Sequence, residues 1–104
     1  MGKEEFEISR EEIPDGVKFI LKGFITSYYA DKLQNELEKT LKDGVVNIVI
    51  NMLFVEYISS TGIKVLLKNF KSAKEAGGKL SIETPSERVK NVLGMVALDE
   101  MLIK

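Results

Sequence analysis

The chain of 104 residues contains no cysteine, no histidine and no tryptophan, and it has only two prolines. Without cysteine it can form no disulfide framework, no thiolate nucleophile and no cysteine-ligated zinc site. Without histidine it lacks the side chain that most often acts as a general base or metal ligand at neutral pH. We expect no metal and no cofactor. Because no pair of carboxylates stands out in the sequence either, we expect no enzyme activity.

An excess of charge of one sign is also absent. Fifteen lysine and arginine residues nearly balance sixteen aspartate and glutamate residues, which gives a formal net charge of -1. A domain built to wrap nucleic acid would carry a large positive charge, so we expect no nucleic-acid partner. No apolar run approaches the roughly 20 residues that cross a bilayer, and no secretory signal follows the acidic start. The sequence predicts a soluble, cytoplasmic protein with no membrane contact.

The chain does contain enough apolar material for one packed core. Hydrophobic residues make up 44% of the sequence and charged residues 30%, whereas disordered chains have fewer apolar residues. The length suits one domain, and no repeat, low-complexity segment or linker divides it. We predict a single domain over residues 1–104, present as a monomer or a weak dimer.

The N-terminal part alternates between apolar and polar side chains, as half-buried strands do. Phe6 and Ile8 begin the alternation, and Val17, Phe19 and Leu21 resume it further along the chain. A Pro-Asp-Gly sequence lies between the two stretches, and these residue types favour a tight turn. The pattern predicts a β-hairpin.

The rest of the sequence predicts alternating helices and strands. Apolar residues at spacings of three and four predict helices over 27–42, 60–76 and 85–96. The β-branched run Val45–Ile50 predicts a parallel strand covered on both faces, and residues 80–82 predict a short strand. The predicted fold is α/β, in the order β-β-α-β-α-β-α. It has one mixed, mostly parallel sheet, with the hairpin at its edge and helices packed on it.

Polar residues at the expected helix starts predict the N-terminal caps. Ser27 is expected to cap the first helix. Thr84 is expected to cap the last helix, with Pro85 in the first helical position and Glu87 reaching back to the cap. A glycine follows each of the first two predicted helices and is expected to end it.

The segment most informative about function begins after Ile50, in what the pattern predicts to be a turn. It ends in three hydroxyl residues and a glycine, Ser59-Ser60-Thr61-Gly62, directly before an apolar helix. The first turn of a helix presents unpaired N–H groups that favour an anion. One hydroxyl residue is explained by a plain cap, whereas a row of three also fits a loop that holds the phosphate of a nucleotide or flavin. Both interpretations are open on the residues alone.

The same segment resembles the signature of STAS domains, specifically of the bacterial anti-sigma factor antagonists. That signature is a β-branched strand, a connection, an aromatic residue and then Asp-Ser-Ser/Thr-Gly-Leu before an apolar helix. The matching residues here are Tyr57–Ile63. Gly23 matches the glycine before the family's first helix, Ala76–Leu80 its helix-to-strand turn, and Pro85–Leu98 its final helix. The resemblance covers nearly the whole chain and implies the STAS fold.

The resemblance implies a switch rather than a catalyst. In that family the domain binds an anti-sigma factor, a kinase of the histidine-kinase-like ATPase fold, and this binding releases the sigma factor for transcription. The kinase phosphorylates the serine two residues before the glycine, which is Ser60 here, and the phosphoprotein dissociates until a metal-dependent phosphatase reverses the step. Ser59 is the alternate acceptor. The implied partner-binding residues are Thr26, Ser27, Tyr28, Ser59, Ser60, Thr61 and Gly62.

Two departures from the family pattern bear on the partner. Ser59 stands where the family usually has aspartate, and Thr26 stands where it often has an acidic residue. A second hypothesis is therefore a STAS subunit that binds within a transporter or signalling assembly without being phosphorylated. A third, less favoured, is a phosphate- or nucleotide-binding domain. An arrangement in which Ser59 caps the helix and Ser60 points outward is compatible with the first hypothesis.

Aromatic residues near this segment are further candidates for a partner surface. Phe54 is expected to fold back over the core, and the alternative is an exposed apolar patch beside the switch. Of Tyr28 and Tyr29, one is expected to pack against the core and the other to be available as an interface anchor.

Overall fold

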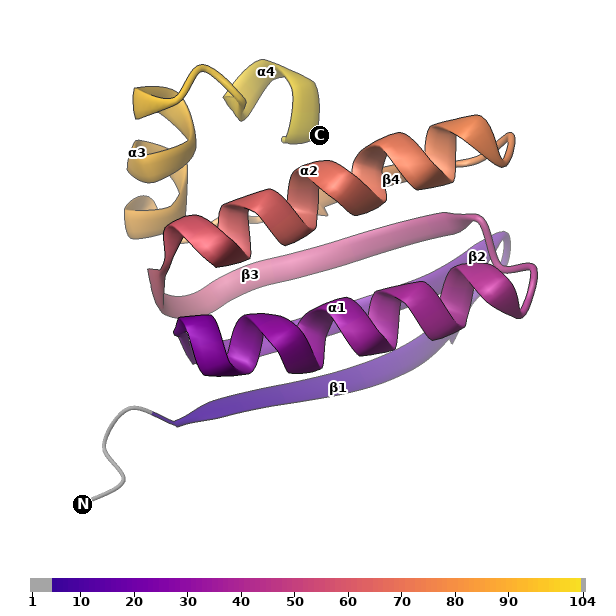
Figure 1. Cartoon of the computed structure of the whole chain (residues 1–104), viewed down its shortest axis with the longest axis horizontal. Coiled ribbons are helices and arrows are strands. Elements are labelled where there is room, and N and C mark those ends of the chain that lie inside the picture. The colour runs from indigo at the N-terminus through magenta and orange to yellow at the C-terminus, as the bar shows by residue number, and fades with distance from the viewer. Residues whose placement is uncertain (1–4, 104) are drawn as a thin grey trace.

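Figure 1 shows the computed structural model, which describes residues 5–103. Four strands form one sheet in the order β1-β2-β3-β4, and they are β1 (Phe6–Ile13), β2 (Gly16–Ile25), β3 (Asn47–Ile58) and β4 (Lys79–Glu83). The helices are α1 (Ser27–Lys42), α2 (Ser60–Glu75), α3 (Glu87–Met95) and the short α4 (Asp99–Leu102). Helices α1 and α2 lie side by side on one face of the sheet, and α3 and α4 follow β4.

The predicted order of elements is confirmed. Strands β1 and β2 are antiparallel and meet at a turn in which Ile13 pairs with Gly16, whereas β2, β3 and β4 are parallel. Gly44 and Gly77 follow α1 and α2 with φ values of 90° and 91°, as expected for the residue after a helix end. The sheet is thus mixed and mostly parallel, with the hairpin strand at its edge.

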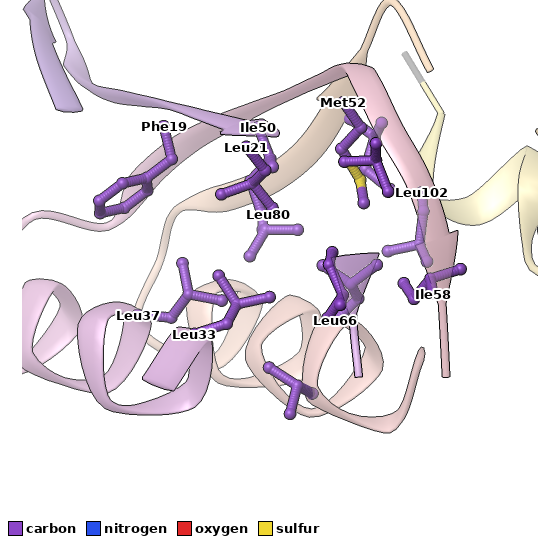
Figure 2. Close-up of a cluster of buried hydrophobic side chains, with 14 of the residues drawn as sticks. Phe19, Leu21, Leu33, Leu37, Ile50, Met52, Ile58, Leu66, Leu80 and Leu102 are labelled. Carbon is purple, nitrogen blue, oxygen red and sulfur yellow. The ribbon is translucent and has the colours of Figure 1, made fainter. Parts of the chain in front are cut away.

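The core lies between the sheet and the two long helices. Leu33 and Leu37 from α1 and Leu66 from α2 are fully buried, and they face the strand side chains Leu21 and Ile50 (Figure 2). Burying one such side chain contributes about 1.5–3 kcal/mol. Because α2 contributes to this core, its first turn is held in a defined place above the sheet.

Strand β3 is parallel, but the prediction that it is covered on both faces was wrong. Ile48, Ile50 and Met52 are buried toward the helices, and Val49 and Asn51 between them are only half-buried. A β-branched run is favoured in any strand, and here its second set of side chains lies on the face opposite α1 and α2.

That opposite face carries polar contacts between strands. The Lys18 ammonium lies 2.9 Å from the Glu83 carboxylate, across β3. The hydrogen bond from Lys18 to Glu83 and the charge of that carboxylate raise the pKa of Lys18. The Asn51 amide donates to the same carboxylate at 3.4 Å. This face is therefore held by polar pairs rather than by a second helical layer.

Strand β3 continues to Ile58, well past the predicted end at Ile50. Two register shifts against β2, between Ile20 and Lys22 and between Gly23 and Phe24, insert extra residues into β3. A β-bulge of this kind leaves one strand residue unpaired and changes the direction of the side chains that follow.

The bulges explain why the sequence pattern predicts a turn where the structure has a strand. Across the bulged stretch, the buried residues of β3 recur at every third position, namely Met52, Val55 and Ile58, instead of every second. Period-two alternation is the signal by which strands are predicted, so the signal is lost in this stretch.

The last helix begins later than predicted. Ser86, and not Thr84, caps α3, and its hydroxyl accepts a hydrogen bond from the Val89 amide at 3.2 Å. The Ser86 amide donates to the Met52 carbonyl at 3.1 Å, and Thr84 has a φ of 48°. Ser86 itself has an extended backbone, with a φ of -67° and a ψ of 163°, so the predicted cap at Thr84 was wrong.

Candidate functional site

The starts of α1 and α2 meet at the carboxyl ends of β2 and β3 (Figure 1). Ile25 and Ile58, the last residues of these parallel strands, are paired, and the Ser59 amide donates to the Ile25 carbonyl at 2.9 Å. Thr26 and Ser59 therefore occupy equivalent positions, each between a strand and a helix. This pairing brings two segments that are far apart in the sequence into one surface.

The two adjacent serines at the start of α2 have different environments. Ser59 is the N-terminal cap, and its hydroxyl accepts a hydrogen bond from the Gly62 amide at 3.1 Å. The Ser59 residue is only 8% exposed, whereas Ser60, the first residue of α2, is exposed. The Ser59 hydroxyl is thus held inside the turn, and the Ser60 side chain is accessible to another protein.

Gly62 allows this turn to pack closely on the strand ends. A Cβ atom at this position would lie 2.8 Å from Ile58 Cγ1 and 2.9 Å from Ile25 Cγ2. Real Cβ atoms do not approach other carbons so closely, and overpacking of this kind costs about 1–3 kcal/mol. Gly62 is buried, and its lack of a side chain lets the first turn of α2 lie against the ends of β2 and β3.

At the start of α1, Thr26 caps the helix, and the prediction of a cap at Ser27 was wrong. The Thr26 hydroxyl accepts a hydrogen bond from the Tyr29 amide at 3.4 Å. Ser27 is exposed instead, and its hydroxyl lies 3.2 Å from the Thr61 hydroxyl on α2. This hydrogen bond joins the first turns of the two helices.

Two tyrosines on α1 behave as the sequence predicts. Tyr28 is 77% exposed, whereas Tyr29 is partly buried and packs against the core. The Tyr29 ring lies 5.4 Å from the Phe6 ring and 5.0 Å from the Tyr28 ring, measured between centroids. Tyr29 therefore supports Tyr28, which projects beside the Ser27–Thr61 contact.

A pocket of about 420 Å³ opens beside the two helix starts. The residues that line it come from four elements and the caps between them, and they are Phe24, Thr26, Ser27, Tyr57, Ser59 and Arg88. The sequence prediction missed three of these as site residues. Tyr57 could have been found as the aromatic residue before the hydroxyl run, but Phe24 and Arg88 reach the pocket only through the fold.

Beside this pocket, the end of β3 exposes apolar side chains. Leu53 is 46% exposed and Phe54 is 54% exposed, so the expectation that Phe54 folds over the core was wrong. The β-bulges turn both side chains outward, and the Lys22 ammonium lies 5.5 Å from the centroid of the Phe54 ring. Tyr57, also partly exposed, continues this apolar surface toward Ser59.

A comparison with known protein families identifies the family of this chain. The family model of the STAS domain matches residues 7–104 of the chain. The chain belongs to the STAS domain family.

Relatives of this STAS domain are found both by sequence and by structure. The anti-sigma-B factor antagonist of Bacillus subtilis (strain 168) is 31% identical over 80 residues, which cover 77% of this chain and 72% of the relative. Among solved structures, the anti-sigma factor antagonist SpoIIAA in its unphosphorylated form has a TM-score of 0.83 at 16% identity. That match covers 93% of this chain and 86% of SpoIIAA.

The phosphorylated form of the Bacillus cell fate determinant SpoIIAA is also similar, with a TM-score of 0.77 at 16% identity. The match covers 93% of this chain and 89% of that structure. At this identity the likeness shows the fold, and it confirms the STAS fold that the sequence pattern implied.

Over residues 5–103, no group of three or more acidic side chains is placed to hold a metal ion. In the same range, no helix is both long enough and apolar enough to span a membrane.

The two serines should differ in their effect on stability. Replacing Ser59 with alanine removes the cap of α2 and is expected to lower the free energy of unfolding by about 1 kcal/mol. Replacing the exposed Ser60 with alanine should change it by less than about 0.5 kcal/mol. Urea denaturation followed by circular dichroism measures both. Equal losses for the two variants would contradict the assignment of Ser59 as the cap.

Proposed function

We propose that this STAS domain is an anti-sigma factor antagonist that is switched off by phosphorylation of Ser60. The observation that carries the proposal is the division of roles between two adjacent serines. Ser59 is buried as the cap of α2, and Ser60 is exposed one residue later. The similarity to the anti-sigma-B factor antagonist of Bacillus subtilis supports the class of partner.

The position of Ser60 suits a phosphate switch. A phosphate adds about -1.5 to -2 charges at neutral pH. At the first residue of α2 this charge would lie near the positive end of the helix dipole, where an anion is tolerated. The domain would therefore stay folded when phosphorylated, and the cost would fall on a partner that had to bury the new charge.

The proposed partner surface is formed by the first turns of the two long helices. Ser27 and Thr61 are hydrogen-bonded to each other across the helix starts, and Tyr28 is the most exposed aromatic side chain beside them. Exposed tyrosines often anchor protein interfaces. Within this surface, Thr26, Ser59 and Gly62 would act mainly by holding the backbone in place.

The partner that we propose is an anti-sigma factor with the kinase fold of histidine-kinase-like ATPases. It would bind the unphosphorylated domain, release its sigma factor, and transfer phosphate from ATP to Ser60. A serine phosphatase would restore the active form. The exchange would take place in the cytoplasm, with the domain acting as a monomer or weak dimer and as a regulator rather than an enzyme.

The second candidate is a STAS subunit that binds its partner without being phosphorylated. Ser59 favours it, because this position lacks the carboxylate that antagonists usually carry before the acceptor serine. A nucleotide-binding domain is the third candidate, and the pocket beside the helix starts is the place where a phosphate would bind.

Affinity capture followed by phosphate transfer tests these candidates. The tagged domain is expected to capture a kinase-fold anti-sigma factor from cells of its source. With Mg-ATP, that kinase should then add one phosphate per chain, which mass spectrometry would locate at Ser60. The Ser60→Ala variant should be captured equally and stay unlabelled.

Three other results would contradict the proposal. A kinase that is active but labels neither serine would favour the accessory subunit. Phosphate on Ser59 instead of Ser60 would overturn the division of roles. A purified domain that carries bound nucleotide or flavin, detected by absorbance, would favour the third candidate.

A further inference from the structure

The exposed face of α2 forms a stripe of positive charge that begins at Ser60. Lys64, Lys68 and Lys71 follow Ser60 at spacings of four, four and three residues, which places all four on one face of the helix. All four are exposed. The opposite face of α2 is buried against the sheet and α1, and its residues include Gly62, Val65, Leu66, Asn69 and Ala73. We call Lys64, Lys68 and Lys71 the lysine stripe.

The charges of the lysine stripe are available to a partner. Among residues 5–103, none of the three lysines forms an ion pair. On α2 itself, the exposed Glu75 follows Lys71 by four residues and limits the stripe at that end. On α1, the Glu38 carboxylate lies 3.1 Å from the Lys42 ammonium. Hydrogen bonding to Lys42 is the main cause of the lowered pKa of Glu38, and the charge of Lys68 contributes least. Glu38 is therefore already paired and does not neutralise the stripe.

The net charge of -1 thus conceals an uneven distribution. Strand β1, at one edge of the sheet, carries the exposed Glu7, Glu11 and Glu12 against one cation, Arg10, which lies 3.7 Å from Glu12. The lysine stripe lies on the helical face, in line with the proposed switch residue. Three exposed lysines in line with Ser60, on a chain of nearly neutral net charge, form a local positive surface suited to a partner of opposite charge.

We propose that the lysine stripe docks on an acidic surface of the anti-sigma factor, next to the place where that partner meets Ser60. This inference rests on the proposed function and specifies the chemistry of its partner. Two signs agree. Lysines attract an acidic surface, and a phosphate on Ser60 would repel the same surface. A basic partner surface would bind the phosphorylated domain more tightly, which is the opposite of a switch that releases.

The phosphate would also act on the stripe itself. Phosphorylated Ser60 would stand one helical turn before Lys64, and a negative group four residues before a lysine pairs with it along the helix. That pairing would withdraw Lys64 from the partner while the new charge repels it. The geometry thus provides two ways for one phosphate to weaken the same contact.

A protein partner fits the stripe better than nucleic acid does. The stripe is a single helix face with three lysines and no arginine, on a chain without excess positive charge. A second copy of the chain could place the glutamates of its β1 edge on the stripe in a head-to-tail contact, but such a contact would not depend on Ser60. Nucleic acid and a second copy are therefore the alternatives that the experiment must separate.

Two double variants test this inference. Each replaces two lysines with glutamate, one within the stripe and the other elsewhere on the domain. The Lys64→Glu/Lys68→Glu variant is expected to bind the purified anti-sigma factor at least about tenfold more weakly than wild type, measured by isothermal titration calorimetry. The matched Lys39→Glu/Lys79→Glu variant has the same net charge. Its substitutions are exposed and lie at the end of the domain opposite Ser60. This control should bind within about twofold of wild type.

Salt dependence gives a second readout. Wild-type affinity should fall as NaCl is raised from low to high concentration. The stripe variant should lose this dependence or reverse it, because salt also screens the repulsion between its new glutamates and the acidic partner surface. Circular dichroism should show that both variants are folded.

Each other outcome overturns the inference. Unchanged binding of the stripe variant, or equal weakening in the control, would remove the lysine stripe from the interface. So would a variant that keeps its affinity for the anti-sigma factor but loses binding to duplex DNA or loses self-association in sedimentation. If Ser60 is phosphorylated normally in those cases, the proposed function stands. If wild type binds no anti-sigma factor and receives no phosphate, the proposed function fails and this inference with it.

Discussion

Replacing Ser60 with glutamate is expected to weaken binding to the anti-sigma factor by about a hundredfold. The substitution places a carboxylate on an exposed position at the start of α2, inside the proposed interface. The partner would have to desolvate this charge or meet it with its own acidic groups. The domain itself should stay folded, because a carboxylate in the first turn of a helix is favourable. Isothermal titration calorimetry at fixed ionic strength measures the change.

Two variants isolate the effect of the charge at Ser60. Ser60→Ala removes the hydroxyl without adding charge and should bind like wild type. Ser9→Glu adds the same charge at an exposed serine on β1, away from the helix starts, and should change the affinity by less than about threefold. Wild-type affinity in Ser60→Glu would argue for a STAS subunit that binds independently of phosphorylation.

Replacing Leu66 with alanine is expected to lower the free energy of unfolding by about 3 kcal/mol. Leu66 is fully buried in the centre of α2, facing strand side chains (Figure 2). Truncation removes apolar contacts and leaves a cavity that the tightly packed sheet cannot close. Since small domains have total stabilities of about 5–15 kcal/mol, this is a large share.

Leu67 provides the matched control for Leu66. It is the next residue on the same helix, and it is only half-buried. Leu67→Ala should therefore cost less than about 1.5 kcal/mol, in proportion to the smaller area removed from the core. Urea denaturation of the two variants and wild type gives the difference. Equal losses, or a larger loss for Leu67→Ala, would mean that α2 does not pack on the sheet through Leu66.

Much of the fold could be predicted because its signals are local. The helical spacing of apolar residues predicts Ser27–Lys42, which are the bounds of α1 in the structure, and the turn chemistry at Pro14 and Asp15 predicts the β1–β2 hairpin. Local signals gave wrong bounds where a contact with a distant part of the chain changed the local structure. The Met52 carbonyl binds the Ser86 amide and moves the start of α3 beyond Pro85.

The position of the candidate site along the sequence could be predicted, but the arrangement of its side chains could not. The hydroxyl run before Gly62 marks the start of α2 in the sequence, and it includes both serines. Residues alone left open which serine caps the helix. The exposure of Phe54 and the pocket position of Arg88 depend on bulges and on packing between elements, for which the sequence carries no periodic signal.

The sequence by itself determined the order of elements, the apolar faces of the helices and the hydroxyl-glycine turn, because each depends on residues within a few positions of one another. Only the tertiary structure decided that Ser59 is buried and Ser60 exposed, and that Ser27 meets Thr61. These facts depend on the pairing of Ile25 with Ile58, a long-range register that the bulges in β3 set.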